Sequence, residues 1–422
     1  QELTLAPHLT VEENITLGAE DSRYGFIQHR HDKVKEVLKL LGQEDLDPQT
    51  PVENLPIGTR QLIEIARAIL NKARVVILDE PTSSLSIENT KALFRVIRKL
   101  RSQGIALVYI SHFLEEIQQI GDRYTILRDG ATVGSGLIEE TSIPEIIKTM
   151  VGRPLNEMYP KIDHTIGEKV LSVKNLSGIP WPKDVSFSLH KGEIMGIFGL
   201  VGAGRSETMR CIFGLDKKIS GEILFKGQTT GPHPSPKKSL SRGIDFLSED
   251  RNKEGLAQKM SIAANTTLSA LRKTSTKGFI NLMEERLVSQ KWRDFMKTKC
   301  HRVTDPVSSL SGGNQQKVAF SRILHHGSEI IILDEPTRGI DVGSKSEIYG
   351  HIQKMASEGK SLLVISSYLP ELQGFCDSIG VMYRGVLSPV KKVSDWTEQD
   401  IMSFATTGMT SSENSIHSKQ PD

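Results

Sequence analysis

Two stretches of the chain share one succession of apolar and polar segments. Residues 75–78 and 330–333 form short, fully apolar runs, which are typical of buried parallel strands. Each run follows a segment with apolar residues at helical spacing, 63–70 and 318–324 respectively. Each also precedes a further apolar run, 106–110 and 362–365 respectively. The pattern predicts an α/β fold in each half, with a doubly wound parallel sheet.

The two halves are related by an internal repeat. VVILDEPTSSLS, which contains Asp79 and Glu80, returns 255 residues later as IIILDEPTRGID. At the same spacing, LPIGTRQ matches LSGGNQQ, and YISHFLEEI matches VISSYLPEL, so that His112 corresponds to Ser367. Three matches in one order indicate two duplicated domains.

The domain boundaries follow from this repeat. The segment 152–169 contains Pro154, Pro160 and Gly167 and follows a helix that Ser142 and Glu145 open as a capping box, so we expect a linker there. The second domain then spans 170–408, and the polar tail 409–422 is expected to be disordered. The first domain, 1–151, begins inside an element, and we expect it to lack its start.

Composition narrows the class of protein. The 422 residues are 37% hydrophobic and 25% charged with a net charge of +2, which suits a globular protein and disfavours a nucleic-acid partner. Cys211, Cys300 and Cys376 have neither zinc-site nor disulfide spacing, which fits a reducing cytoplasm. No apolar run approaches the roughly 18 to 20 residues that span a bilayer, so membrane contact would require a partner protein.

GLVGAGRS, residues 199–206, follows the apolar run 194–198 and precedes the helical pattern 207–213. It fits the phosphate-loop pattern G-x-x-x-x-G-K-S except for Arg205 at the Lys position. The glycines would let backbone N–H groups surround phosphates, and Ser206 could ligate Mg²⁺. Because the planar guanidinium is a poor copy of an ammonium, we expect nucleotide binding with impaired hydrolysis. A glycine-rich turn without a ligand is the alternative.

Each LDEP string places an Asp at a strand end, followed by a Glu. Asp79 and Asp334 are candidate Mg²⁺ ligands, and Glu80 and Glu335 are candidates to polarise the attacking water. One such pair alone would more often cap a helix or face solvent in a turn. Its recurrence within the repeat favours the functional interpretation.

LSGGNQQKV, residues 310–318, places Ser311, Gly312 and Gly313 just before a helix, where backbone N–H groups attract anions. Together with both LDEPT strings, GLVGAGRS and the ISH ending at His112, it resembles ATP-binding-cassette proteins. More narrowly, GLVGAGRS, SEDRNKEGL, LSGGNQQKV and DEPTRGID are similar to the second cassette of bacterial monosaccharide importers of the ribose, galactose and xylose types. The likeness covers nearly the whole chain.

The resemblance implies two tandem RecA-like cassettes, each with a helical subdomain, which meet head to tail. Each ATP then lies between the phosphate loop of one cassette and the signature loop of the other. The implied catalytic residues are Glu80, His112 and Glu335. The implied nucleotide contacts are Gly199, Gly202, Ala203, Gly204, Arg205, Ser206, Ser311, Gly312, Gly313, Gln1, Glu249 and Asp341. The implied metal ligands are Ser206, Asp79, Asp334 and Gln1.

The resemblance further implies that the two composite sites are unequal. One joins Asp79, Glu80 and His112 to the intact signature around Ser311, with Gln1 sensing Mg²⁺ and the attacking water and Asp341 communicating between cassettes. Its phosphate loop is expected upstream of Gln1, so the chain alone should show little ATPase activity. The other joins the Arg205 loop to LPIGT, where Pro56 replaces the signature Ser and Gly58 keeps one glycine. Glu249 stands there at the Gln position and Ser367 at the His position, which predicts slow turnover or none.

The implied function is that of the ATP-hydrolysing energy-coupling subunit of a sugar-type importer, using ATP and Mg²⁺. It would lie in the cytoplasm on the inner face of the membrane, bound to integral permease subunits through helical subdomains in 4–54 and 252–306, and indirectly to a periplasmic or extracellular sugar-binding protein. Two alternatives stay open: a hydrolysis-deficient nucleotide-binding remnant, and a soluble ribosome-associated tandem cassette protein. Trp181 is a candidate for adenine stacking, with core packing as its alternative.

Overall fold

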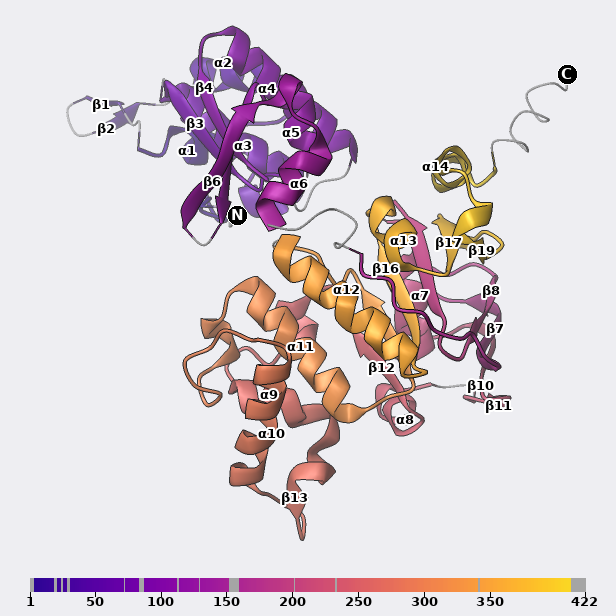
Figure 1. The fold of residues 1–422 in the computed structure, drawn as a ribbon. Coiled ribbons are helices and arrows are strands. Elements are labelled where there is room, and N and C mark those ends of the chain that lie inside the picture. The colour runs from indigo at the N-terminus through magenta and orange to yellow at the C-terminus, as the bar shows by residue number, and fades with distance from the viewer. Residues whose placement is uncertain are drawn as a thin grey trace, which may run out of the picture. The chain divides into compact units, whose positions relative to one another are not determined.

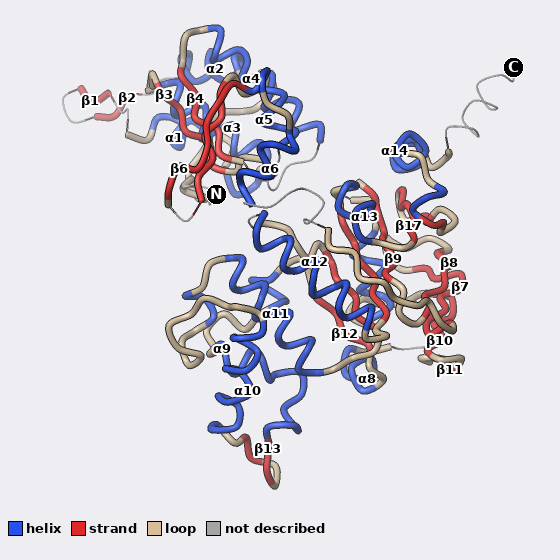
Figure 2. The backbone as a smooth tube through the Cα atoms, viewed as in Figure 1, coloured by secondary structure: helices blue, strands red, loops and turns tan. Residues whose placement is uncertain are grey.

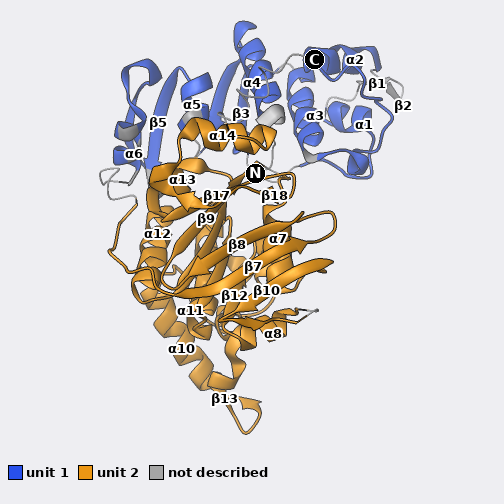
Figure 3. Ribbon diagram, turned by 90° about the vertical axis from the view of Figure 1, so that its right-hand side faces the viewer, with its two compact units in different colours: residues 1–152 blue, residues 153–422 orange. Residues whose placement is uncertain are grey.

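The chain folds into two compact units, Gln1–Gly152 and Arg153–Asp422, which are coloured separately in Figure 3. The computed structural model describes residues 4–18, 21–23, 26–28, 31–71, 73–82, 87–111, 114–128, 130–151, 159–200, 202–231, 234–340 and 342–410. Among the described residues, no helix combines the length and the apolar character that crossing a membrane requires.

Unit 1 is an α/β unit whose main core joins α1, α2, α3, β3 and α4 (Figure 1). Strands β3 and β4 are parallel, and β5 and β6 form an antiparallel pair. Its elements, in chain order, are α1 (Val11–Thr16), β1 (Asp21–Arg23), β2 (Phe26–Gln28), α2 (His31–Leu40), η1 (Val52–Asn54), α3 (Ile57–Leu70), β3 (Val75–Asp79), α4 (Ile87–Ser102), β4 (Ala106–Ile110), α5 (Leu114–Ile120), β5 (Arg123–Arg128), β6 (Ala131–Leu137), η2 (Ile138–Glu140) and α6 (Ile143–Val151).

Unit 2 begins with an antiparallel sheet and a phosphate-loop segment. The elements up to the hairpin are β7 (Lys169–Ser177), β8 (Val185–His190), β9 (Ile194–Gly199), α7 (Arg205–Phe213), β10 (Ser220–Phe225), β11 (Gln228–Thr229), α8 (Pro236–Ser241), β12 (Ile244–Leu247), the π-helical turn η4 (Arg251–Gly255), α9 (Ile262–Thr267), η5 (Leu268–Thr274), β13 (Ser275–Thr276) and β14 (Phe279–Ile280). The remaining elements are α10 (Leu282–Phe295), η6 (Val307–Ser309), α11 (Gly312–His326), β15 (Ile330–Asp334), α12 (Val342–Ser357), β16 (Ser361–Ser366), α13 (Leu369–Phe375), β17 (Ser378–Tyr383), β18 (Val386–Leu387), β19 (Lys391–Lys392), η7 (Val393–Asp395) and α14 (Glu398–Thr407).

The central sheet of unit 2 positions the candidate site. Its strand order is β12-β15-β16-β9-β17-β18, with β19 also on β17, and the first five strands are parallel (Figure 2). A separate antiparallel sheet has the order β11-β10-β7-β8. Because parallel strands end at one edge, the loops after β9, β15 and β16 converge there, which is where ligands bind in open α/β sheets.

Most predicted elements agree with the structure, but two helices begin earlier than predicted. α3 begins at Ile57 and α11 at Gly312, so both signature segments form first helical turns. Apolar periodicity does not mark these turns because, apart from Ile57, their residues are glycine or polar. Half of the predicted capping box is seen: the Ser142 N–H donates to Glu145 Oε2 (3.0 Å) ahead of α6, whereas the Glu145 N–H donates to the Ser142 backbone carbonyl (3.1 Å).

The parallel strands of the two units differ in how they are covered. In unit 1, Val75, Ile77, Val108 and Ile110 are 56%, 66%, 49% and 46% exposed. Their counterparts in the repeat, Ile330, Ile332, Leu363 and Ile365, are each 0% exposed. The core cluster that contains these counterparts also contains residues of α7 and of the antiparallel sheet. One face of the β3–β4 pair is therefore apolar and open in unit 1.

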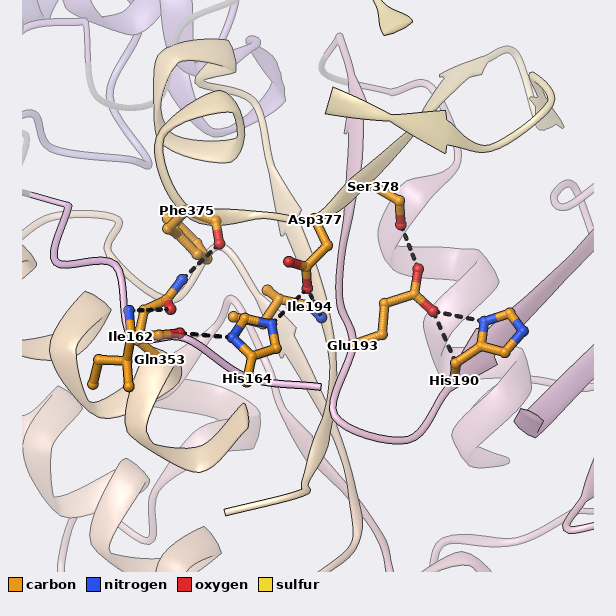
Figure 4. A network of polar contacts seen from close by, with 9 residues as sticks. All are labelled: Ile162, His164, His190, Glu193, Ile194, Gln353, Phe375, Asp377 and Ser378. Carbon is orange, nitrogen blue, oxygen red and sulfur yellow. Dashed lines mark hydrogen bonds and ion pairs between the residues drawn. The ribbon is translucent and has the colours of Figure 1, made fainter. Parts of the chain in front are cut away.

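Part of the predicted linker is bound to unit 2, as Figure 4 shows. The His164 ring nitrogen Nε2 lies 3.0 Å from Asp377 Oδ2, which also accepts the Ile194 N–H (2.8 Å). The Ile162 N–H donates to the Gln353 side-chain oxygen (3.2 Å). Residues 152–158 of this linker, and residues 411–422 of the predicted disordered tail, lie outside the described residues.

Candidate functional site

The predicted phosphate loop connects the end of β9 to the start of α7, as the motif requires. Gly202 and Gly204 have φ of 81° and 96°, a region that favours glycine. At Gly199 a Cβ would lie 2.7 Å from the Met382 carbonyl oxygen. These three positions therefore need glycine, which supports the phosphate-loop interpretation over an ordinary turn. The backbone of Ala203 is fixed by a bond from its N–H to Leu200 O (3.0 Å).

Arg205 makes a buried ion pair within this site. Its Nη2 lies 3.2 Å from Glu335 Oε1, and both side chains are 8% exposed. Its other terminal nitrogen, Nη1, is buried and has no hydrogen-bond partner among the described residues. An unpaired buried donor costs free energy until an acceptor arrives, and phosphate oxygens are suited to that role.

Glu335 is held from two sides. Its φ of 47° is unusual for a residue other than glycine, and its N–H donates to Ile365 O (2.9 Å). The carboxylate oxygen that faces Arg205 also accepts the Ser367 N–H (2.8 Å). The residue at the His position thus contacts Glu335 through its backbone. Both contacts are to Oε1, so the negative charge of Glu335 is already paired within unit 2.

Asp334 and Ser206 lie close together at the ends of β15 and the phosphate loop, near enough for the Ser206 hydroxyl to influence the pKa of Asp334. Burial raises the pKa of Asp334 to about 7, despite the opposing effects of Ser206 and Arg205. The Asp334 Oδ1 is buried and has no hydrogen-bond partner in the described part of the chain. A hydroxyl and a carboxylate with a spare oxygen are ligands suited to Mg²⁺, so these residues fit the ion that the sequence predicts.

Glu249, at the predicted Gln position, forms an ion pair with Arg338. Burial, and to a lesser extent the positive charge of Arg205, lower the pKa of Arg338. Two arginines and the carboxylates of Glu249, Asp334 and Glu335 thus gather at this edge. The predicted site residues Gln1, His112 and Asp341 lie outside the described residues.

The signature segment of unit 2 forms the N-terminus of α11. Ser311 is the N-cap residue and makes no capping bond; instead its Oγ accepts from the Asn314 side chain (2.9 Å). Gly312 and Gly313 therefore lie in the first turn rather than before the helix as predicted. The N–H groups of such an uncapped turn are oriented to bind an anion.

Unit 1 repeats this geometry only in part. Glu80 has φ of 45° and its N–H donates to Ile110 O (2.9 Å), as in Glu335. Asp79 is exposed, whereas Asp334 is 2% exposed. Pro56 is the N-cap residue of α3 without a side-chain capping bond, and Gly58 is buried in the first turn. No hydroxyl stands at the Ser311 position in this half.

Trp181 lies against the phosphate loop. A Cβ at Gly204 would be 3.0 Å from Trp181 Cγ, and the ring also approaches the Gly385 backbone. The Lys183 Nζ lies 4.4 Å from the ring centroid. The sequence left adenine stacking and core packing open, and the ring in fact packs on backbone beside the loop while staying partly exposed.

Arg251 and Arg338 are site residues that the sequence motifs did not single out. Arg338 pairs with Glu249, and the Arg251 Nη1 donates to Gly312 O (2.6 Å). The dense charge of SEDRNKEGL, which contains Arg251, was the available signal in the sequence. Nothing in the neighbouring residues indicates which distant loops these charges contact.

Comparison with known proteins places these features in a family. The profile of the ABC transporter family matches residues 1–83 and 182–338. The ribose import ATP-binding protein RbsA 3 of Rubrobacter xylanophilus is 43% identical over 408 residues, which are 96% of this chain and 82% of that protein. RbsA of Geobacillus kaustophilus, also a ribose import ATP-binding protein, is 42% identical over 412 residues, which are 97% of this chain and 83% of that protein. A solved nucleotide-free ATP-binding cassette from an ABC transporter is 21% identical with a TM-score of 0.47, covering 53% of this chain and 92% of that one.

Proposed function

Because this chain belongs to the ABC transporter family of ATP-binding proteins, which are ATPases, we propose that it couples ATP hydrolysis to sugar import through a membrane permease. The observation that carries the proposal is the convergence of the 199–206 loop, Asp334 and Glu335 at one edge of the central sheet. The relatives are named ribose import proteins, so a monosaccharide is the proposed class of solute.

We propose that ATP binds to unit 2 along the phosphate loop. The backbone N–H groups at the start of α7 and the unpaired Arg205 Nη1 would bind phosphate oxygens, and Trp181 would contact the base. Ser206 and Asp334 would hold Mg²⁺, which neutralises charge on the phosphates. Because Glu335 is engaged by Arg205 and Ser367, this site would turn ATP over slowly.

The second composite site would use Glu80 of unit 1 and the signature turn at Ser311. The open apolar face of β3 and β4 supports this assignment, since the matching face of unit 2 is covered by the phosphate-loop helix and the antiparallel sheet. We infer that a strand–loop–helix segment of the same construction covers the face in the working protein. Glu80 and His112 would then act on ATP there, as base and phosphate sensor. Closure of the two cassettes on ATP would move the permease.

The direct test is nucleotide binding by this chain. MgATP is expected to change tryptophan fluorescence, because Trp181 lies beside the phosphate loop. The Asp334→Asn variant should bind more weakly, since the amide is a poorer Mg²⁺ ligand than a carboxylate. Absence of saturable binding in the unsubstituted chain would contradict the proposed function.

The same titration has an expected pH dependence. Burial raises the pKa of Asp334 to about 7, so the neutral acid dominates below that pH and cannot hold Mg²⁺ as a carboxylate does. The affinity for MgATP should therefore fall by roughly tenfold per unit below about pH 7 and level off above it. Asp334→Asn should lack this dependence. An equally steep decline in that variant would assign the titration to another group.

We propose that the permease contacts an apolar surface formed by β14 and the start of α10, the hairpin surface. Phe279, Leu282, Met283 and Leu287 are 81%, 60%, 75% and 58% exposed there. The buried residues of α10 are instead polar, Glu285 and Ser289, and Thr267 donates to Glu285 Oε1 (2.9 Å). An exposed apolar face opposite a buried polar one indicates a protein partner. This contact would place the protein at the inner face of the membrane.

Substituting this surface should separate ATP binding from uptake. Met283→Ser with Leu287→Ser is expected to reduce uptake by the assembled importer about tenfold, because interface anchors of this kind carry much of the binding energy. Fluorescence-detected MgATP binding should stay unchanged. Met402→Ser, which alters an exposed apolar residue of α14, is the matched control. Full uptake by the double variant would exclude the hairpin surface as the contact.

A further inference from the structure

Arg251 lies between two loops of unit 2 that are far apart in sequence. Its Nη1 donates to the carbonyl of Gly312, in the first turn of α11, at 2.6 Å. A Cβ at Gly339 would lie 3.3 Å from its Nη2, so the guanidinium also sits against the loop that follows Glu335. Gly339 has φ of 64°, and a side chain there would be strained as well as crowded.

The residues around Arg251 connect to further parts of the same site. Glu249 pairs with Arg338, next to Gly339. Glu254 accepts from Arg210 of α7 with both carboxylate oxygens at 2.6 Å, and α7 is the helix that begins at the phosphate loop. The segment 249–255 therefore contacts the phosphate-loop helix, the loop after Glu335 and the signature turn. Its π-helical turn is a geometry that is rare and often occurs at functional sites.

We propose that Arg251 is a positioning residue that holds the signature turn, Ser311–Gly313, for the ATP bound there, and links that turn to the nucleotide loops of its own half. The proposal rests on the proposed function, in which this turn completes the site of Glu80.

Electrostatics support a role in anion binding. A cation at a helix N-terminus opposes the helix dipole, so stability of α11 does not explain why Arg251 lies there. Burial also lowers the pKa of Arg251, which shows that its charged form is disfavoured at this place. An ATP phosphate at the same turn would be attracted by both the N–H groups and the guanidinium. Arg251 would then favour the conformation of the signature turn that binds nucleotide.

The experiment compares Arg251→Met, Arg251→Lys and Arg242→Met. Arg242 is the matched control because its Nη1 also donates to a backbone carbonyl, that of Thr230 (3.2 Å), away from these loops. In the chain, hydrogen exchange of the amides in 315–318, the first that bond within α11, should become roughly tenfold faster in Arg251→Met, with exchange in β9 unchanged. Arg251→Lys should restore most of the protection, because the ammonium can still reach one carbonyl. Arg242→Met should leave these amides as they are.

A second measurement separates positioning from folding. In the assembled importer, Arg251→Met should lower kcat about tenfold while MgATP binding detected by tryptophan fluorescence stays within about twofold. Unchanged exchange at 315–318, faster exchange throughout unit 2, or wild-type kcat in Arg251→Met would each overturn the proposal. If the unsubstituted protein neither binds nor hydrolyses ATP, the proposed function fails, and the exchange data still decide whether Arg251 holds the turn.

Discussion

Replacing Glu80 by Gln in the assembled importer is expected to lower ATP turnover at least about 100-fold and to stop uptake, because a positioned base contributes about that factor or more. Glu335→Gln is expected to stay within about threefold of the unsubstituted protein. The reason is that the Glu335 carboxylate is already bound through Oε1 by Arg205 and the Ser367 N–H, which pairs its charge within unit 2. Loss of the Glu335 carboxylate should therefore remove little of the catalytic activity.

ATPase activity and sugar uptake in reconstituted vesicles are the measurements for this pair. Glutamine is nearly isosteric with glutamate, so Glu80→Gln should fold and bind MgATP, which tryptophan fluorescence can verify. Glu335→Gln leaves Arg205 buried without its carboxylate, so urea unfolding must show that this variant is folded under the assay conditions. Nucleotide should stay trapped in the Glu80→Gln importer after washing, because closure precedes hydrolysis. Equal losses in the two variants would contradict the proposed inequality of the sites.

Arg205→Met should destabilise unit 2 by about 3–5 kcal/mol, the range for breaking a buried ion pair by removing one partner. Arg205 and Glu335 are both 8% exposed, so the methionine variant leaves a buried carboxylate that keeps, among the described residues, the Ser367 N–H as its partner. Arg205→Lys keeps the positive charge and should lose much less. Nucleotide affinity should fall in the methionine variant as well, because Nη1 is a donor available to phosphate.

Urea unfolding followed by tryptophan fluorescence isolates this effect. All three tryptophans, Trp181, Trp292 and Trp396, lie in unit 2, so the signal reports that unit alone. Combining Arg205→Met with Glu335→Gln should recover most of the loss, since the buried charge is then absent. A loss below about 1 kcal/mol in Arg205→Met, the range of exposed pairs, would show that the pair is solvated in solution.

The repeat, the strands and the phosphate loop could be predicted from the sequence because each depends on residues close together along the chain. Apolar runs specify β3 and β15, and the glycines of 199–206 specify the turn that their φ values require. The family resemblance rested on motifs of the same local kind, and the comparisons confirm it.

The pairing of charges could not be predicted in this way. Arg205 meets Glu335 across 130 positions because β9 and β15 end at the same edge of one sheet. Arg251 meets Gly312, and Glu249 meets Arg338, for the same reason. A sequence motif states which groups are present, whereas their partners and their pKa values depend on which loops the sheet brings together and how deeply it buries them. The availability of Glu335 as a base is therefore a property of the folded chain, since it arises from contacts that no neighbouring residue supplies.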